Sequence, residues 1–150
     1  MTDLAEHVLT AANTIAVVGL SRDPGKAAHA VPASLQAAGF RIIPVHPSAD
    51  ELLGEKVYRS LTDIPEPVDL VDVFRPPVEA PEIARQAVAI GAKTLWLQQG
   101  IVSAEARRIA EEGGLDYVED RCTAVVRALG RITKKEDHQE VSPTQGPPRG

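Results

Sequence analysis

Segments with strand-like and helix-like patterns alternate along most of the chain, and this alternation constrains the possible folds more than any other feature. Runs of apolar and β-branched residues, typical of buried strands, occur at 14–20, 41–47, 68–74, 93–99 and 115–120. Segments with apolar residues at helical spacing separate these runs. Strands that alternate with helices become parallel neighbours joined by right-handed crossovers. We therefore expect an α/β fold, a Rossmann-like, doubly wound, mostly parallel five-stranded sheet with helices on both faces.

Residues that start, stop or interrupt elements place the expected boundaries. We expect Thr2 to cap the first helix and Ser103 to cap the fourth. Pro32 is placed in the first turn of a helix that Gly39 stops. Pro44 lies inside the second predicted strand, where it removes one ladder donor. The expected helices are 3–12, 31–38, 81–92, 103–114 and 123–129.

The last 18 residues differ in composition from the rest of the chain. The segment 133–150 is polar and rich in proline and glycine, and Val141 is its only aliphatic residue. Such a segment cannot bury enough apolar surface to order itself. We therefore predict one domain over 1–132, followed by a disordered polar tail over 133–150.

Charge and cysteine content exclude several classes of protein. The net charge is −5, whereas a general nucleic-acid binder needs an excess of Lys and Arg. No apolar stretch is long enough to cross a bilayer, and the N-terminus lacks the features of a signal peptide. The single cysteine, Cys122, cannot form an internal disulfide and suits a reducing compartment. We expect a cytoplasmic protein that binds neither nucleic acid nor membrane, and we find no pair of residues with metal-ligand spacing.

The carboxyl ends of the predicted strands define the candidate site. In open α/β sheets, ligands bind outside these ends, near the point where the strand order reverses. The segments that leave the five strands here are 19–21, 46–47, 74–77, 98–101 and 120–122.

The first of these segments, in "IAVVGLSRDPGKAAHAV", matches neither of two well-known phosphate-binding motifs. In the P-loop pattern G-x-x-x-x-G-K-[ST], the first glycine falls on Leu20 and the Ser/Thr falls on Ala27. In the dinucleotide pattern G-x-G-x-x-G, Gly19 fits, but Ser21 and Pro24 replace the other two glycines. No acidic residue ends the second strand to hold an NAD ribose, so ordinary NAD binding is disfavoured.

The turn nevertheless has the chemistry of an anion site. Gly19 permits a tight turn, and the Ser21 hydroxyl can donate to a phosphate oxygen. The backbone N–H groups of the following helix add donors. Arg22 and Lys26 supply positive charge, although each alone is explained equally well as a solvated loop residue.

Several separated stretches resemble the small, single-domain CoA-binding proteins. These proteins are related to the CoA-binding domain of the succinyl-CoA synthetase α subunit. The resemblance covers about residues 10 to 130 and includes every strand-end segment named above. It rests on the stretches "TIAVVGLSRDPGKAAHAVP", "GFRIIPVHP", "GEKVYRSLTDIPEPVDLVDVFRPP", "GAKTLWLQQGI" and "DRC".

The resemblance implies a CoA-binding Rossmann fold and a role for each matching segment. Around the CoA phosphates it places Gly19, Ser21, Arg22 and Lys26. At the nucleotide end it places His46 and Pro47, where the family usually has Asn-Pro or Ser-Pro. Beside the ligand it places Phe74, Arg75 and Pro76, and near the pantetheine arm Gln99, Gly100 and Ile101. CoA carries a 3′-phosphate besides its diphosphate, so its site needs more positive charge than an NAD site.

Two further residue types have alternative interpretations. Cys122, at the end of the fifth strand, is either a small buried apolar residue or a thiol that faces bound CoA and forms a mixed disulfide with it. Asp69 and Asp72 lie between apolar residues of the third strand, which favours a structural role.

Three functions follow from the sequence. The first is reversible binding of CoA or acyl-CoA without catalysis, since no nucleophile–base–orienter set is evident. The second is an NAD(P)-binding oxidoreductase or a subunit of one, with Arg22 near an NADP 2′-phosphate. The third is a degenerate Rossmann domain used for protein contacts.

Overall fold

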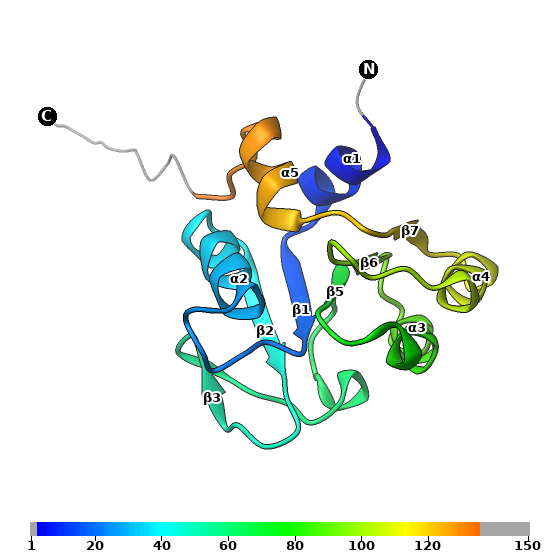
Figure 1. The fold of residues 1–150 in the computed structure, drawn as a ribbon, viewed down its shortest axis with the longest axis horizontal. Coiled ribbons are helices and arrows are strands. Elements are labelled where there is room, and N and C mark those ends of the chain that lie inside the picture. The colour runs from blue at the N-terminus through cyan, green and yellow to red at the C-terminus, as the bar shows by residue number, and fades with distance from the viewer. Residues whose placement is uncertain (1–2, 136–150) are drawn as a thin grey trace, which may run out of the picture.

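The computed structural model describes residues 3–135 and confirms the predicted fold class (Figure 1). Five parallel strands form one sheet in the order β2-β1-β5-β6-β7. The order reverses at β1, because β2 lies on one side of it and β5 on the other. These strands are β1 (Thr14–Val18), β2 (Arg41–Val45), β5 (Leu70–Val73), β6 (Thr94–Leu97) and β7 (Asp116–Val118).

Five helices cover the two faces of the sheet, as a doubly wound fold requires. α1, α2 and α5 pack on one face, and α3 and α4 pack on the other (Figure 1). The helices are α1 (Leu4–Ala11), α2 (Ala27–Ala37), α3 (Ala80–Ala89), α4 (Ala104–Glu112) and α5 (Thr123–Gly130).

Alternation along the strands divides the core into two layers. Ile15, Leu70 and Trp96 point toward α1, α2 and α5, while Val71 and Leu95 point toward α3 and α4. All five side chains are fully buried. The central strands are therefore apolar on both faces, as is usual in parallel sheets.

Two short elements between β2 and β5 were not expected from the sequence. β3 (Glu51–Leu52) and β4 (Glu55–Lys56) form a small antiparallel hairpin of their own. Single 3₁₀ turns occur at Leu61–Asp63 and Pro77–Glu79. Two-residue strands and single turns carry too few residues to show a hydrophobic period.

Two predicted helix starts were wrong, and two other predicted boundary residues, the cap Ser103 and the helix stop Gly39, are confirmed. The cap of α1 is Asp3, whose carboxylate accepts the Glu6 N–H at 2.8 Å, and Thr2 lies outside the described residues. α2 begins at Ala27, so Pro32 is its sixth residue and not part of the first turn. Ser103 caps α4 through the Ala106 N–H, and Gly39, with φ of +102°, follows the end of α2.

Pro44 lies in β2, which is an edge strand. Its carbonyl accepts the N–H of Tyr58 on the outer side of the sheet, away from β1. The missing N–H therefore costs no ladder bond, because the two backbone groups of one strand residue point to the same side.

The first residues of the predicted tail contact the domain. Thr133 Oγ1 and the Lys134 N–H both donate to the Ala38 carbonyl. The rest of 133–150, from residue 136 onward, lies outside the described residues, so the tail and the boundary at 132 stay predictions. Among the described residues, no helix combines the length and the apolar character that crossing a membrane requires.

Candidate functional site

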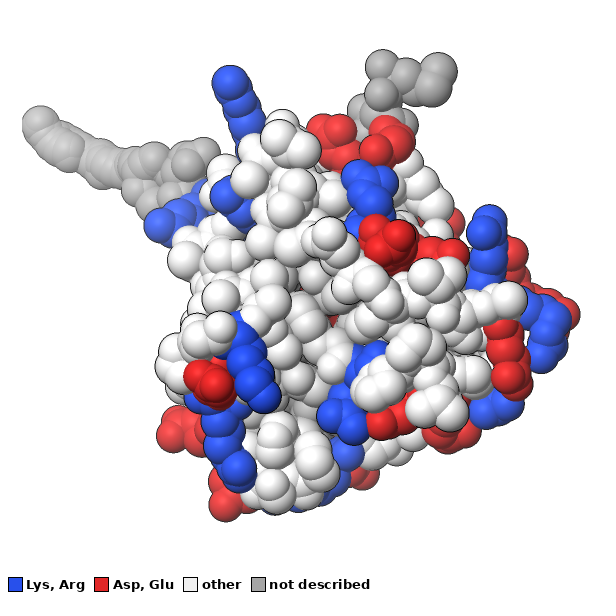
Figure 2. Space-filling model, viewed as in Figure 1, with Lys and Arg blue, Asp and Glu red and all other residues white. Residues whose placement is uncertain are grey.

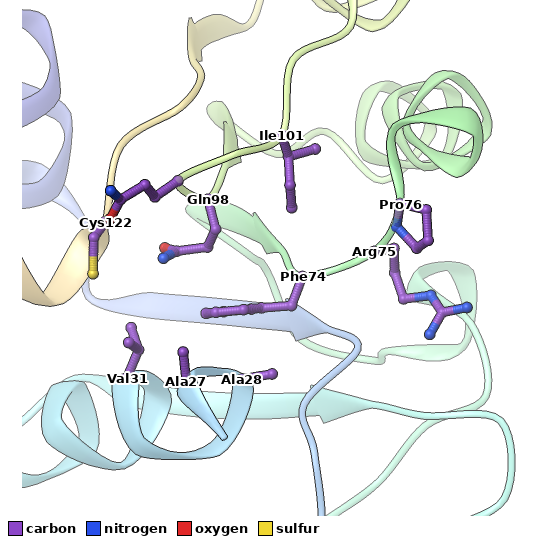
Figure 3. Close-up of a pocket in the computed structure, with 10 residues that line it drawn as sticks. Ala27, Ala28, Val31, Phe74, Arg75, Pro76, Gln98, Ile101 and Cys122 are labelled. Atoms are coloured by element: carbon purple, nitrogen blue, oxygen red, sulfur yellow. The ribbon is translucent and has the colours of Figure 1, made fainter. Parts of the chain in front are cut away.

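Two adjoining cavities lie at the carboxyl edge of the sheet, beside the reversal point at β1. A polar cavity of about 480 Å³ is bounded by the β1–α2 loop and the end of β2. An apolar cavity of about 530 Å³ lies between the start of α2, the ends of β5 and β6, and the start of α5 (Figure 3). Both cavities are lined by Ala28, Phe74 and Arg75, so they adjoin at these residues, and we refer to the two together as the groove. On this face, separate groups of Lys and Arg side chains flank a largely uncharged hollow (Figure 2).

Gly19 allows β1 to turn sharply into the loop below the polar cavity. Its φ is +93°, which L side chains rarely adopt. A Cβ atom there would lie 2.7 Å from the Phe74 carbonyl oxygen and 2.8 Å from Arg75 Cδ. Gly19 therefore lets the two loops that line the groove approach each other.

The side chains of Ser21 and Asp23 order the loop locally. Ser21 Oγ accepts the Asp23 N–H at 3.0 Å, and Asp23 Oδ1 accepts the Gly25 N–H at 2.9 Å. Because the Ser21 oxygen acts as an acceptor here, its hydroxyl hydrogen stays available for a ligand oxygen.

The backbone of Ser21 is tied to the first turn of α2. Its N–H donates to the Ala28 carbonyl at 3.1 Å, and its own carbonyl accepts His29 Nδ1–H at 2.8 Å. The Ala28 carbonyl is free to accept because its helical donor would be residue 32, a proline without an N–H.

Three cationic side chains line the polar cavity: Arg22, Lys26 and Arg75. Arg75 forms a two-bond ion pair with Glu79, with distances of 2.9 and 2.7 Å. This pair raises the pKa of Arg75 and lowers the pKa of Glu79, and it fixes the guanidinium where the two cavities meet. Lys26 has no ion pair among the described residues, so its charge is not neutralised locally.

His46 presents a defined tautomer beside these cations. Its Nδ1 accepts the N–H groups of Ser48 at 3.0 Å and Ala49 at 2.9 Å. The proton of the neutral ring therefore lies on Nε2. Burial, and after it three nearby guanidinium groups, lower the pKa of His46 below 6.5; these groups belong to Arg22, Arg59 and Arg75.

The apolar cavity begins at the N-terminus of α2. The N–H groups of Ala27 and Ala28 have no hydrogen-bond partner within residues 3–135. Free N–H groups at a helix start, together with the helix dipole, favour an anion. Beyond them the walls become apolar, with Val31 and Ile101 facing the ring of Phe74 (Figure 3).

Cys122 lies at the end of this cavity and is held there by its neighbours. The Trp96 indole N–H donates to the Arg121 carbonyl at 2.8 Å. Asp120, with φ of +58°, accepts the Gly100 N–H through its carboxylate at 2.7 Å. These bonds fix the segment that carries the Cys122 sulfur into the cavity (Figure 3).

The structure brings the sequence-predicted site residues together, with one exception. Gly100 lines neither cavity, because its N–H is bonded to Asp120 and the residue is exposed. The polar cavity is lined by Gly19, Ser21, Arg22, Lys26, His46 and Pro47, the apolar one by Pro76, Gln99, Ile101 and Cys122, and both by Phe74 and Arg75.

Sequence reasoning missed several lining or supporting residues. Ala27, Ala28 and Val31 line the groove because α2 starts four residues earlier than predicted. The alanines at 27, 28 and 30 were a usable signal, since alanine is the strongest helix former. Gln98 lies in the predicted strand-end segment 98–101 but was not named as a site residue, and His29 carried no comparable signal because its role depends on a tertiary hydrogen bond. Within residues 3–135, no three His, Cys, Asp or Glu side chains are grouped as metal ligands.

Comparison with known proteins connects this groove to a family. The family model described as a CoA binding domain matches residues 13–128. The uncharacterized protein YneT of Bacillus subtilis is 40% identical over 124 residues, which are 83% of this chain and 92% of that protein. A hypothetical protein from Pyrococcus horikoshii OT3 has a similar structure, with a TM-score of 0.81 and 36% identity, covering 85% of this chain and 89% of that one.

The same region occurs in much longer enzymes. Acetate–CoA ligase [ADP-forming] II of Archaeoglobus fulgidus is 34% identical over 100 residues, which are 65% of this chain and 15% of the ligase. The matched residues 13–128 contain all five parallel strands and every residue that lines the two cavities. The resemblance inferred from the sequence is confirmed: the chain belongs to the CoA-binding domain family, to which the corresponding domain of ADP-forming acetate–CoA ligases is homologous.

Proposed function

We propose that this chain binds CoA or an acyl-CoA reversibly in the groove at the carboxyl edge of its sheet. The phosphates lie against the β1–α2 loop and the start of α2, and the adenosine lies beside His46 and Pro47. The pantetheine arm extends through the apolar cavity toward Cys122. The observation that carries the proposal is that a cation-lined cavity and an apolar one adjoin and share Phe74 and Arg75 in their walls.

The shape and lining of the groove support a ligand with two unlike halves. CoA joins a phosphorylated nucleotide to a long, mostly apolar arm. The polar cavity offers Arg22, Lys26 and the Ser21 hydroxyl to phosphates. The apolar cavity offers few polar groups, as expected for a site that encloses an arm.

The surroundings of His46 bear on the choice between CoA and a nicotinamide coenzyme. Dinucleotide-binding folds place a carboxylate at the end of the second strand to hold the ribose hydroxyls. Here a neutral imidazole lies at that place, near Arg22 and Arg59. The positive charge of these two guanidinium groups favours a phosphorylated ribose over a ribose with free hydroxyl groups, which supports CoA over NAD. The ligase reaction is not part of the proposal, because the chain matches only 15% of the length of the ligase.

A thermal-shift and calorimetry panel tests the proposal directly. CoA and acetyl-CoA are expected to bind, and a hundredfold excess over the dissociation constant stabilises the protein by about 2.7 kcal/mol. Dephospho-CoA is expected to bind about tenfold or more weakly, since it lacks one phosphate and its charge-assisted contacts. Uptake of NAD or NADP without uptake of CoA would overturn the proposal in favour of an oxidoreductase.

A matched pair of variants localises the site. Lys26→Ala removes a cation from the polar cavity and is expected to weaken CoA binding by about tenfold. Lys93→Ala removes an exposed lysine next to the start of β6, at the opposite edge of the sheet, and leaves affinity unchanged. Equal affinities for the two variants would remove Lys26 from the site.

A further inference from the structure

Gln98 is a largely buried polar residue whose side chain borders the apolar cavity. Its side chain is 5% exposed and lines the cavity beside Phe74 and Cys122 (Figure 3). The amide oxygen accepts hydrogen bonds from Thr123, but the amide nitrogen has no partner among the described residues. The nitrogen is not among the buried side-chain atoms that lack a partner, so it borders the open space of the cavity, where it can donate to a ligand.

The orientation of the Gln98 amide follows from its contacts with Thr123. The Thr123 backbone N–H donates to Gln98 Oε1 at 3.1 Å, and Thr123 Oγ1 lies 2.8 Å from the same oxygen. A reversed amide would direct its N–H₂ group at the Thr123 N–H, donor against donor. The oxygen therefore faces α5 and the nitrogen faces away from it.

Asp72 determines where the single hydroxyl hydrogen of Thr123 goes. Thr123 Oγ1 lies 3.1 Å from Asp72 Oδ2 as well as 2.8 Å from Gln98 Oε1, and one hydrogen cannot serve both oxygens. Asp72 is fully buried on the central strand between Val17 and Trp96, with no cation paired to it in residues 3–135. Burial raises its pKa to about 8, so the carboxyl is protonated at neutral pH.

A protonated Asp72 completes an ordered chain of hydrogen bonds. Asp72 donates to Thr123 Oγ1, Thr123 donates to Gln98 Oε1, and the Gln98 amide nitrogen is left with both of its hydrogens. Asp72 Oδ1, which has no hydrogen-bond partner within residues 3–135, is then an uncharged carbonyl oxygen and not half of a buried carboxylate. These hydrogen bonds hold the Gln98 amide in one orientation before any ligand binds.

We propose that Gln98 recognises a carbonyl oxygen on the arm of the bound ligand, and that Thr123 and Asp72 are positioning residues that hold its amide nitrogen toward that carbonyl. This inference rests on the proposed function, since it concerns the same groove. The arm of CoA carries two amide carbonyls, and an acyl-CoA adds a thioester carbonyl. Each supplies the acceptor that the cavity wall lacks.

Binding measurements with and without the arm test the inference. Gln98→Glu keeps an oxygen for Thr123 but replaces the N–H₂ donor, and Gln98→Met removes both. Both variants are expected to bind CoA about tenfold or more weakly than the wild type. Adenosine 3′,5′-bisphosphate, which lacks the arm, is expected to bind all three proteins equally, and this also shows that the variants are folded.

Variants of Thr123 test its role in positioning the Gln98 amide. Thr123→Val removes the hydroxyl and is expected to lower affinity for CoA several-fold without changing affinity for adenosine 3′,5′-bisphosphate, whereas Thr123→Ser restores it. A larger loss for acetyl-CoA than for CoA in the Gln98 variants identifies the thioester carbonyl as the partner, and equal losses identify an amide carbonyl.

The outcomes separate the inference from the proposed function. Unchanged affinity for both CoA and acetyl-CoA in both Gln98 variants, with Lys26→Ala still impaired, overturns the inference and leaves the proposed function intact. Failure of the wild type to bind CoA overturns both.

Discussion

Ser21 and Pro32 are linked through one carbonyl oxygen, that of Ala28. Proline at the sixth position of α2 supplies no N–H to this carbonyl, and the Ser21 N–H takes the vacant place at 3.1 Å. A residue that is unfavourable in the middle of a helix thus secures the loop beneath the polar cavity.

Pro32→Ala is expected to affect stability and binding in opposite directions. Alanine removes the penalty of an interior proline, so the melting temperature stays equal or rises. Its N–H competes with Ser21 for the Ala28 carbonyl, so the loop loosens and CoA affinity falls by up to about tenfold, a loss of about 1.4 kcal/mol. Thermal melting and calorimetry on the same preparation measure both effects. An unchanged affinity would show that the Ser21 bond does not order the site.

Gly19→Ala is expected to destabilise the fold by roughly 1–3 kcal/mol and to abolish CoA binding, because it combines a strained φ with a contact on the Phe74 carbonyl. Gly114→Ala is the matched control. Gly114 has φ of +85°, but a Cβ atom there meets no atom of the described part of the chain within 4 Å. Urea unfolding of both variants separates backbone strain from the steric contact, and equal losses would contradict a role for the contact.

His46 is expected to make the protein less stable as the pH falls below neutrality. The pKa of His46 is lowered in the folded chain, so between that pKa and 6.5 the unfolded chain binds more protons and the free energy of unfolding rises with pH. Protonation of Nδ1 also breaks the bonds from Ser48 and Ala49. In His46→Asn the amide oxygen can accept the same N–H groups without titrating.

Melting temperatures of the wild type and of His46→Asn, each measured at pH 7.5 and pH 5.5, test this prediction. The wild type is expected to lose more stability than His46→Asn over this range. His7→Asn, at an exposed position of α1, serves as the control and should follow the wild type. Parallel behaviour of His46→Asn and the wild type would refute the assignment.

Asp72 is expected to make the protein less stable as the pH rises, which is the opposite of the effect of His46 and covers a different pH range. Its pKa is raised by burial from 3.8 to about 8, so between these values the folded chain binds the extra proton and the free energy of unfolding falls as the pH rises. Asp72→Asn keeps a donor for Thr123 and does not titrate. Its stability relative to the wild type is therefore expected to increase from pH 5 to pH 8, as measured by urea unfolding. Asp116→Asn, on the exposed start of β7, should show no such trend.

Cys122 is expected to exchange with CoA disulfide. Attack of the Cys122 thiolate on one sulfur forms a mixed disulfide and releases one CoA thiol, so electrons balance without another oxidant. Mass spectrometry of the intact chain should show one CoA attached, and none on Cys122→Ser. Glutathione disulfide should react more slowly, since it lacks the phosphates that the loop binds. An unmodified wild type after prolonged incubation would leave Cys122 as an apolar wall residue.

The fold was predictable because the core strands are mostly apolar runs and four of the five, all except β2, are followed by an α-helix before the next strand or the end of the domain. The start of α2 was not predictable. Proline is usually found in the first turn of a helix, so Pro32 suggested a start near residue 31. In the structure Pro32 lies inside α2, where the Ser21 N–H replaces the hydrogen bond that proline cannot donate to the Ala28 carbonyl. Most of the residues that line the two cavities were predictable because the ends of parallel strands meet at one edge. Among the exceptions, the places of Gly100 and Gln98 depend on which way a backbone or side-chain amide points. These directions are set by Asp120 and Thr123, which lie 20 and 25 residues away in the sequence.

Pro44 has a further consequence for how the molecule behaves among its own copies. An open sheet border with free N–H and C=O groups can template intermolecular β-pairing and aggregation. On the outer side of β2, proline offers no donor, and its carbonyl is already occupied by Tyr58. This border therefore resists recruiting a foreign strand, and replacing Pro44 would expose the protein to self-association at high concentration.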